Sequence, residues 1–213
     1  MKCDKETMLL YAVTDRMWTG NQTLYEQVEA ALRGGVTCIQ LREKEMNDEE
    51  FLKEAIEIKA LCKKYKVPFF INDNVDIAIK CGADGIHIGQ DDMPVEKVRC
   101  LVGNNMIIGV SVHTVKEAID AIEKGADYLG VGAVFSTSTK LDADVVGLDA
   151  LKDICHNTDV PVVAIGGLNK DNIYKLAKSG VDGVALVSAI FKATDIEREC
   201  RELFRISREM VKA

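Results

Sequence analysis

A short phrase recurs along the chain and constrains its fold more than any other feature. A glycine, a small apolar residue and an aspartate precede an apolar run at 82–86, 125–129 and 180–184, with a looser version at 34–38. Each copy follows a segment with helical spacing, and glycine just past a helix end favours the left-handed cap conformation. A repeated helix–glycine–strand unit is typical of strands and helices that alternate around a parallel sheet.

The apolar runs predict eight short strands, and the patterned segments between them predict eight helices. The predicted strands cover residues 9–13, 36–41, 68–71, 85–88, 107–110, 128–131, 160–165 and 183–187. The predicted helices cover residues 23–33, 48–65, 75–80, 95–101, 115–123, 148–155 and 172–178, with a tail helix from about 195. This α/β pattern predicts a (β/α)₈ TIM barrel, with residues 1–213 as a single domain. A doubly wound open sheet is the alternative, and it normally has a glycine-rich first turn, which residues 14–16 do not provide.

Composition limits the possible partners. The formal net charge of −7 argues against a nucleic-acid partner. We expect no membrane partner, because no apolar run reaches membrane-spanning length and the first residues lack the apolar middle of a signal peptide. Seven scattered cysteines without a Cys-x-x-Cys pair are typical of reduced thiols, so we expect a cytoplasmic protein. The sequence does not specify an oligomeric state, and a homo-oligomer is an open alternative.

The second predicted strand ends in a cationic stretch. Side chains alternate along a strand, so Gln40, Arg42 and Lys44 project to one side together. Two cations and an amide at the end of a buried strand are costly to desolvate unless an anion meets them. A strand that runs into a charged surface loop is the alternative. Because the active site of a barrel lies at the carboxyl ends of its strands, we favour an anion-binding role.

Two aspartates follow neighbouring predicted strands and are candidate metal ligands. Asp73 follows the third strand and Asp92 follows the fourth, so we expect their carboxylates to converge. Oxygen ligands suit Mg²⁺, which keeps waters and takes phosphate oxygens as its remaining ligands. The alternative is that Asn72, Asp73 and Asn74 only cap the next helix. The cations nearby favour the metal, and we predict Mg²⁺ as the cofactor.

A second anion site is predicted after the last two strands. Gly166 and Gly167 permit close approach of a ligand to the backbone, and Val187 and Ser188 end the eighth strand. Loops at these two positions form the usual phosphate site of such barrels. Close packing is the alternative explanation of the two glycines.

The loop after the sixth predicted strand offers three hydroxyls and a cation, at Thr137, Ser138, Thr139 and Lys140. A solvated Ser/Thr loop is the usual explanation of such a run, but its position between the two anion sites favours a lid. A cationic, metal-assisted site suits a pyrophosphate, and a site built from backbone suits a monophosphate. Together they predict transfer between two phosphorylated small molecules.

Eight motifs follow one enzyme family in order along the chain. They are YAVTD (11–15), QLREK (40–44), IND (71–73), GIHIGQDD (85–92), GVS (109–111), TSTK (137–140), AIGG (164–167) and VSAI (187–190). In these motifs the chain resembles the thiamine-phosphate synthase family, also called thiamine-phosphate pyrophosphorylases. The resemblance implies a transferase that joins hydroxymethylpyrimidine pyrophosphate to a thiazole phosphate or carboxythiazole phosphate. It also implies Mg²⁺-assisted dissociative chemistry, in which pyrophosphate leaves before the thiazole nitrogen attacks.

The resemblance also assigns roles to residues at the matching positions. The residues implied to bind the pyrimidine pyrophosphate are Gln40, Leu41, Arg42, Glu43, Lys44, Asn72, Ser111 and Lys140. Among these, the cations Arg42, Lys44 and Lys140 are implied to assist catalysis. The residues implied to bind the thiazole phosphate are Thr137, Ser138, Thr139, Gly167, Val187 and Ser188. Asp73 and Asp92 are implied to bind Mg²⁺.

Other proteins of the same fold remain alternatives. Thiazole tautomerase (TenI-like) enzymes need no pyrophosphate, and they typically lack the aspartate at Asp92 and the Thr-x-Thr-Lys loop that this sequence carries. A non-catalytic phosphate-binding regulator would bind the same ligands without turnover. An aldolase would be expected to carry a Schiff-base lysine inside a strand, and none of the predicted strands contains a lysine.

Overall fold

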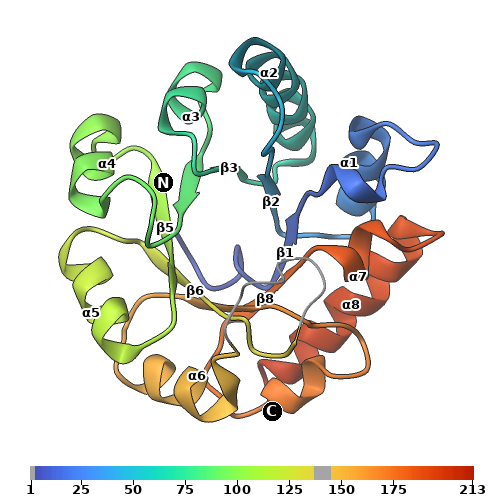
Figure 1. The fold of residues 1–213 in the computed structure, drawn as a ribbon. Coiled ribbons are helices and arrows are strands. Elements are labelled where there is room, and N and C mark those ends of the chain that lie inside the picture. The colour runs from blue at the N-terminus through green and yellow to red at the C-terminus, as the bar shows by residue number, and fades with distance from the viewer. Residues whose placement is uncertain (1–2, 137–144) are drawn as a thin grey trace.

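Eight parallel strands close into a barrel in the computed structural model, which describes residues 3–136 and 145–213 (Figure 1). The strands are β1 (Leu10–Val13), β2 (Cys38–Leu41), β3 (Phe69–Asn72), β4 (Gly85–Ile88), β5 (Ile107–Val112), β6 (Tyr128–Val131), β7 (Val162–Ile165) and β8 (Gly183–Leu186). Each strand pairs with the next in sequence, and β8 pairs with β1. The closed barrel confirms the predicted fold and excludes the doubly wound open sheet.

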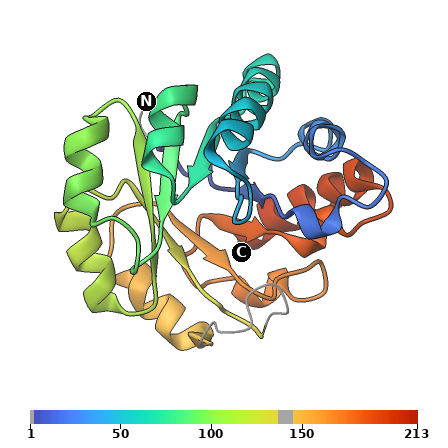
Figure 2. The same cartoon turned by 45° about the horizontal axis from the view of Figure 1, so that its top comes forward.

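The helices form a ring outside the barrel (Figures 1 and 2). They are α1 (Leu24–Arg33), α2 (Asp48–Tyr65), α3 (Val75–Cys81), α4 (Val95–Val102), α5 (Val115–Glu123), α6 (Gly147–His156), α7 (Ser188–Phe191) and α8 (Ile196–Met210), with 3-10 helices η1 (Arg16–Trp18) and η2 (Ile173–Leu176). Side-chain oxygens cap several of them, and Thr23 forms a capping box with Glu26 at the start of α1. Among the described residues, no helix combines the length and apolar character needed to cross a membrane.

The helix predicted over residues 172–178 is wrong, because the segment forms only the short 3-10 helix η2. Asn172 does not cap a helix here. Its Nδ2 donates to the carbonyl of Gly167 at 2.8 Å, and its Oδ1 accepts from the amide of Asn169 at 2.8 Å. The side chain that could have started an α-helix therefore closes the loop after β7 instead.

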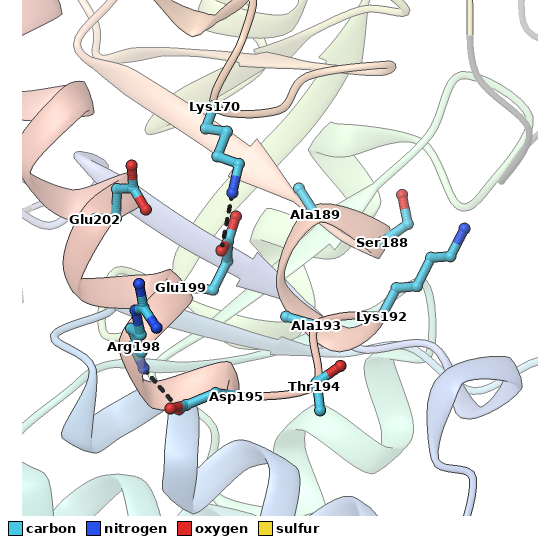
Figure 3. A pocket seen from close by; sticks show the side chains of 10 residues that line it. All are labelled: Lys170, Ser188, Ala189, Lys192, Ala193, Thr194, Asp195, Arg198, Glu199 and Glu202. Carbon is cyan, nitrogen blue, oxygen red and sulfur yellow. Dashed lines mark hydrogen bonds and ion pairs between the residues drawn. The ribbon is translucent and has the colours of Figure 1, made fainter.

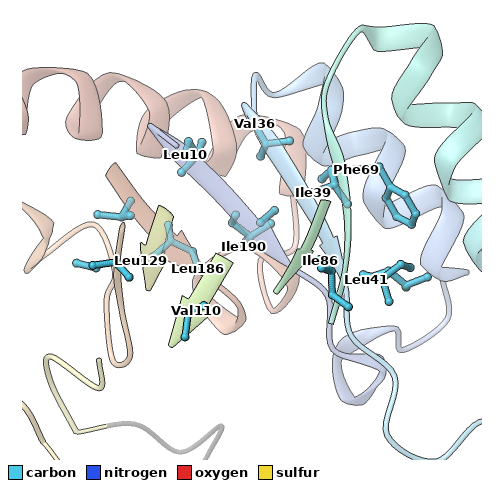
Figure 4. Close-up of a cluster of buried hydrophobic side chains, with 14 of the residues drawn as sticks. Leu10, Val36, Ile39, Leu41, Phe69, Ile86, Val110, Leu129, Leu186 and Ile190 are labelled. Atoms are coloured by element: carbon cyan, nitrogen blue, oxygen red, sulfur yellow. The ribbon is translucent and has the colours of Figure 1, made fainter. Parts of the chain in front are cut away.

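Two apolar layers hold the barrel together. Outward-facing strand residues pack against the helices and form the outer core, which Figure 4 shows in part. Inward-facing residues fill the barrel, and the aromatic rings of Tyr11, Phe70 and Tyr128 lie among them. Two glycines make room for these rings. A Cβ on Gly85 would lie 2.2 Å from the Phe70 ring, and one on Gly109 would lie 2.0 Å from the Tyr128 ring.

The recurrent phrase has a structural role at the amino ends of the strands. The aspartate, or threonine in the looser copy, stands just before an even-numbered strand and accepts a hydrogen bond from the preceding odd-numbered strand. The bonds run from Leu10 N to Thr37 Oγ1 (2.9 Å), Phe69 N to Asp84 Oδ2 (2.8 Å), Ile108 N to Asp127 Oδ2 (2.8 Å) and Val162 N to Asp182 Oδ2 (2.9 Å). Each satisfies an amide at the barrel end opposite the expected active site.

Candidate active site

The last inward-facing residues of the strands form the floor of the barrel mouth. In strand order they are Val13, Gln40, Asn72, His87, Ser111, Gly130, Ile165 and Val187. Some neighbours stand directly opposite each other in the sheet, as Asn72 and His87 do, and Ser111 and Gly130. The inward-facing residues from β2 to β5 have polar side chains. Those of β6, β7, β1 and the end of β8 are small or apolar. The floor therefore offers hydrogen-bonding groups on one half and an apolar surface on the other.

A continuous set of hydrogen bonds runs through this floor, and we call it the floor network. Gln40 Nε2 donates to the Tyr11 hydroxyl at 2.8 Å, and the hydroxyls of Tyr11 and Tyr128 lie 2.9 Å apart. His87 then contacts the Tyr128 hydroxyl through Nδ1 and Ser111 Oγ through Nε2, both at 2.9 Å. Five side chains from five strands are thus linked.

The titratable members of the floor network are held neutral. Burial lowers the pKa of His87 to about 4, against a smaller opposing effect of Asp92. Burial also raises the pKa of Tyr11 and of Tyr128 well above their ordinary values. Neither tyrosine was predicted as a site residue, although period-two alternation in β1 and β6 places both side chains inside the barrel.

A cation and two carboxylates meet at the ends of β2, β3 and β4. Lys44 Nζ lies 2.5 Å from Asp73 Oδ2, and Asp92 Oδ2 accepts from the amide of Gly89 at 2.7 Å. Partial burial raises the pKa of Asp92, and the neighbouring Asp73 carboxyl adds to this while the Gly89 amide and Lys44 oppose it. The structure therefore brings Asp73 and Asp92 together, as predicted. The cap of α3 is Asn74, whose side chain accepts from Ile77 N.

The carboxylate pair fits a magnesium ion. The described residues contain no group of three or more His, Cys, Asp or Glu side chains that could hold a metal by themselves. Two adjacent carboxylates are sufficient for Mg²⁺, which keeps several waters and completes its shell with substrate phosphate oxygens. Their mutual repulsion is also relieved by a cation. The chemistry of the donor set at Asp73 and Asp92 thus suits Mg²⁺ better than Zn²⁺, which prefers nitrogen and sulfur ligands.

Arg42 is held between the first two strands. Its backbone amide donates to Thr14 Oγ1 at 3.0 Å, and its guanidinium Nη1 lies 3.9 Å from Asp15 Oδ2. The side chain is partly exposed, so its donors remain accessible from the mouth.

Leu41 and Glu43 lie behind this cationic stretch. Leu41 is fully buried in the outer core. Glu43 accepts from Arg16 through both carboxylate oxygens, at 2.9 and 3.3 Å, and Arg16 also contacts Glu54 at 2.6 Å. Burial raises the pKa of Glu43, and the bonds from Arg16 oppose this rise. These two side chains fix the position of the loop, and their roles toward the substrate stay predictions.

The predicted phosphate loops have unusual backbone conformations. Gly166 and Gly167 adopt φ of 95° and 66°, and a Cβ on Gly167 would lie 2.4 Å from the carbonyl oxygen of Ser136. Ser188 begins the short helix α7, and Val187 precedes it. Close packing therefore suffices to explain Gly167, and its role toward phosphate stays a prediction. Thr137, Ser138, Thr139 and Lys140 lie outside the described residues.

A groove of about 530 Å³ lies beside the mouth, between α7, α8 and the loop before η2 (Figure 3). Lys170 Nζ and Glu199 Oε2 face each other across it at 3.5 Å. Ser188 lines its edge and is, among the described residues, the one that the groove shares with the predicted site. Gln40, Arg42, Lys44 and Asp73 belong to other strand ends. The groove is thus a flank of the candidate site and does not contain its polar half.

Most of the chain resembles proteins of one biosynthetic family. The family model described as Thiamine monophosphate synthase matches residues 10–190. Relatives named Thiamine-phosphate synthase from Clostridium acetobutylicum and Clostridioides difficile are 48% and 49% identical over 197 and 195 residues, covering 92% of this chain and 93% of each relative. The solved structure of the thiamine phosphate pyrophosphorylase from Pyrococcus furiosus superposes with a TM-score of 0.90 at 41% identity, covering 97% of this chain and 98% of that one. The chain therefore belongs to the thiamine monophosphate synthase family.

Proposed function

We propose that the protein joins hydroxymethylpyrimidine pyrophosphate to a thiazole phosphate, giving thiamine phosphate and pyrophosphate. Family membership supports the reaction. The observation that carries the assignment to this site is the meeting of Lys44 with Asp73 beside Asp92. A cation next to two metal-type carboxylates is what a departing pyrophosphate requires.

The pyrophosphate half of the reaction falls to the ends of β2, β3 and β4. Arg42 and Lys44 would donate charge-assisted hydrogen bonds to the phosphate oxygens, and Lys140 would add a third cation. Mg²⁺ held by Asp73 and Asp92 would offset the negative charge that grows on the leaving group. Asn72 and Ser111 line the same polar half and would orient the pyrimidine end.

The acceptor half falls to the other side of the mouth. Val13, Ile165 and Val187 offer an apolar surface suited to a flat heteroaromatic ring. Ser188, with the predicted contributions of Gly167 and residues 137–139, would receive the phosphate of the thiazole. The ring nitrogen would then face the pyrimidine methylene and capture it after pyrophosphate has left.

This chemistry needs no nucleophile from the protein. The neutral His87 is already bonded at both ring nitrogens, which supports a structural rather than a general-base role. We place the reaction in the cytoplasm, where free thiols such as the seven cysteines here persist.

An assay with both substrates, with and without Mg²⁺, tests the proposal. We expect equal amounts of thiamine phosphate and pyrophosphate, only when both substrates and Mg²⁺ are present. Conversion of a thiazole tautomer in the absence of the pyrimidine would favour the tautomerase alternative. Calorimetric binding of both ligands without any product would favour the regulator, and either result would contradict the proposal.

A further inference from the structure

The floor network joins two predicted substrate contacts that lie on different strands. Gln40 stands on β2 and Ser111 on β5, and the path between them passes through Tyr11 on β1, Tyr128 on β6 and His87 on β4. Gln40, Tyr11 and Tyr128 are buried, so water does not compete for these bonds. A change at one end therefore has a direct path to the other.

The protons in the floor network are limited in number. Four hydrogen bonds link the five side chains, and each bond needs one proton. The two phenols and a neutral imidazole supply one proton each. The fourth must come from one end, either from the Gln40 amide or from the Ser111 hydroxyl. If one end donates into the network, the other end must accept from it.

The structure selects Gln40 as the donating end, since its Nε2 faces the Tyr11 hydroxyl. Tyr11 then donates to Tyr128, and Tyr128 donates to His87 Nδ1. The imidazole must therefore carry its proton on Nε2 and donate it to Ser111 Oγ. This direction leaves the side-chain oxygen Gln40 Oε1 available to accept from a ligand and the Ser111 hydroxyl available to donate to one.

We propose that Tyr11, Tyr128 and His87 are positioning residues that fix Gln40 as an acceptor and Ser111 as a donor toward the substrate. The proposal rests on the proposed function, which makes these two residues substrate contacts. It narrows the substrate class to a ring with a hydrogen-bond donor, such as an exocyclic amine, at the Gln40 end. An acceptor, such as a ring nitrogen or a phosphate oxygen, belongs at the Ser111 end. An oxo analogue that reverses this pattern would face two mismatched groups.

The protonation of the His87 ring nitrogens gives a direct test. ¹⁵N NMR of the ligand-free protein distinguishes an imidazole nitrogen that carries a proton from one that does not. The sequence has three histidines, so His113 and His156 serve as internal references. We expect His87 to be neutral with its proton on Nε2.

A substitution three hydrogen bonds away should move that proton. In Gln40→Glu the side chain can only accept once its carboxyl group is ionised. Because burial raises the pKa of a carboxyl group, the spectra are recorded over a pH series that reaches about pH 10. The direction of the network must then reverse, and the His87 proton should shift to Nδ1. In Gln40→Glu combined with Tyr11→Phe the connection is cut, so the carboxylate no longer sets the direction of the network, and the His87 spectrum should match that of Tyr11→Phe alone.

The outcomes of the NMR measurements separate this proposal from the proposed function, because these measurements involve no turnover. A His87 proton on Nδ1 in the unmodified protein would overturn the proposal. So would a charged His87, or a tautomer that Gln40→Glu leaves unchanged. The amide spectrum of the same samples reports whether each variant is folded.

A kinetic cycle provides a second measurement if Gln40→Glu does not fold. The effects of Gln40→Ala and Ser111→Ala on kcat/KM should be non-additive by at least about threefold in the unmodified background, as is common for residues in one network. In the Tyr128→Phe background, which keeps the ring and removes the hydroxyl, the two effects should become additive. Additive effects in both backgrounds would contradict the coupling.

Discussion

Lys44 Nζ lies 2.5 Å from Asp73 Oδ2, so a cation from the end of β2 contacts a carboxylate from the end of β3. The lysine side chain is 53% exposed, and ion pairs with such exposure contribute only about 0–1 kcal/mol to stability. Asp73 also adopts a φ of 61°, a left-handed conformation that costs a non-glycine residue energy. The contact therefore does little to stabilise the barrel, which supports the proposed role of both residues in ligand binding.

Replacing Lys44 with Ala should weaken binding of the pyrimidine pyrophosphate and spare the thiazole phosphate. A hydrogen bond to a charged group contributes about 1.5–3 kcal/mol, which corresponds to roughly 10- to 150-fold in affinity. Calorimetry with each ligand alone would measure both constants. The melting temperature should hardly change, because the pair is exposed. Equal loss of affinity for both ligands would argue against two separate anion sites.

Replacing Asp92 with Asn should shift the Mg²⁺ dependence of turnover to higher concentration and lower the maximal rate by at least about tenfold, equal to about 1.4 kcal/mol of barrier. The amide keeps an oxygen for the Gly89 amide but loses the charge that a hard cation needs. Asp91→Asn is the matched control, since Asp91 is an exposed neighbour outside the carboxylate pair. A Mg²⁺ titration that is the same in both variants would refute the metal assignment.

His87 should make the stability of the protein depend on pH. Its pKa falls from 6.5 to about 4 on folding, so the unfolded state binds the proton more readily. The associated stability is complete above about pH 6.5 and is lost as pH falls toward 4, by up to about 3 kcal/mol at 1.36 kcal/mol per unit. Denaturant unfolding of the unmodified protein and of His87→Gln between these values would reveal the difference. Parallel pH profiles for the two proteins would rule out a buried neutral histidine.

Asp84 should stabilise the barrel without affecting catalysis. It accepts from Phe69 N at 2.8 Å and from Lys59 Nζ at 2.5 Å, at the end of the barrel away from the mouth. Asp84→Ala leaves a backbone amide and a lysine without their partner, which should cost about 2–3 kcal/mol. Asp120→Ala is the control, because its pair with Lys124 is exposed and contributes about 0.5 kcal/mol or less. An unchanged free energy of unfolding in Asp84→Ala would contradict the structural role assigned to the aspartate of the recurrent phrase.

The sequence could predict the barrel because its signals are local. The recurrent phrase marks the turn from helix to strand within five residues, and alternation then places Gln40 inside and Leu41 outside the barrel. The convergence of Asp73 and Asp92 followed from topology alone, since neighbouring parallel strands end at the same edge.

The floor network could not be predicted because its bonds join residues far apart in the sequence. Tyr11 and Tyr128 are separated by 117 positions. Tyr11 lies in the motif at 11–15 and Tyr128 in the recurrent phrase at 125–129, and neither stretch reveals that the two hydroxyls meet. The pairing of Glu43 with Arg16 likewise joins residues far apart in the sequence. The helix predicted over residues 172–178 is wrong for a different reason, since Asn172, a residue type common at helix starts, closes the loop after β7 instead.

Replacing Ser188 with Ala, rather than changing Gly167, should reveal the thiazole phosphate site. Any side chain at Gly167 would meet the Ser136 carbonyl at 2.4 Å in a left-handed conformation, so Gly167→Ala should destabilise the fold whether or not phosphate binds there. Ser188→Ala removes only a hydroxyl and should leave the fold unchanged. Without it, affinity for thiazole phosphate should fall by about tenfold or more, as expected for a hydrogen bond to a charged group.

Ser111→Ala is the reciprocal control for that measurement, because its hydroxyl lies on the polar half of the mouth. Ser111→Ala should weaken binding of the pyrimidine pyrophosphate. It should change the affinity for thiazole phosphate by less than about twofold, a free-energy difference below the roughly 0.5 kcal/mol of a weak hydrogen bond. Calorimetry on both variants gives four affinities, and the expected pattern is one loss for each ligand. If Ser188→Ala binds thiazole phosphate normally, the phosphate is held elsewhere, and the loop after β8 loses its assigned role.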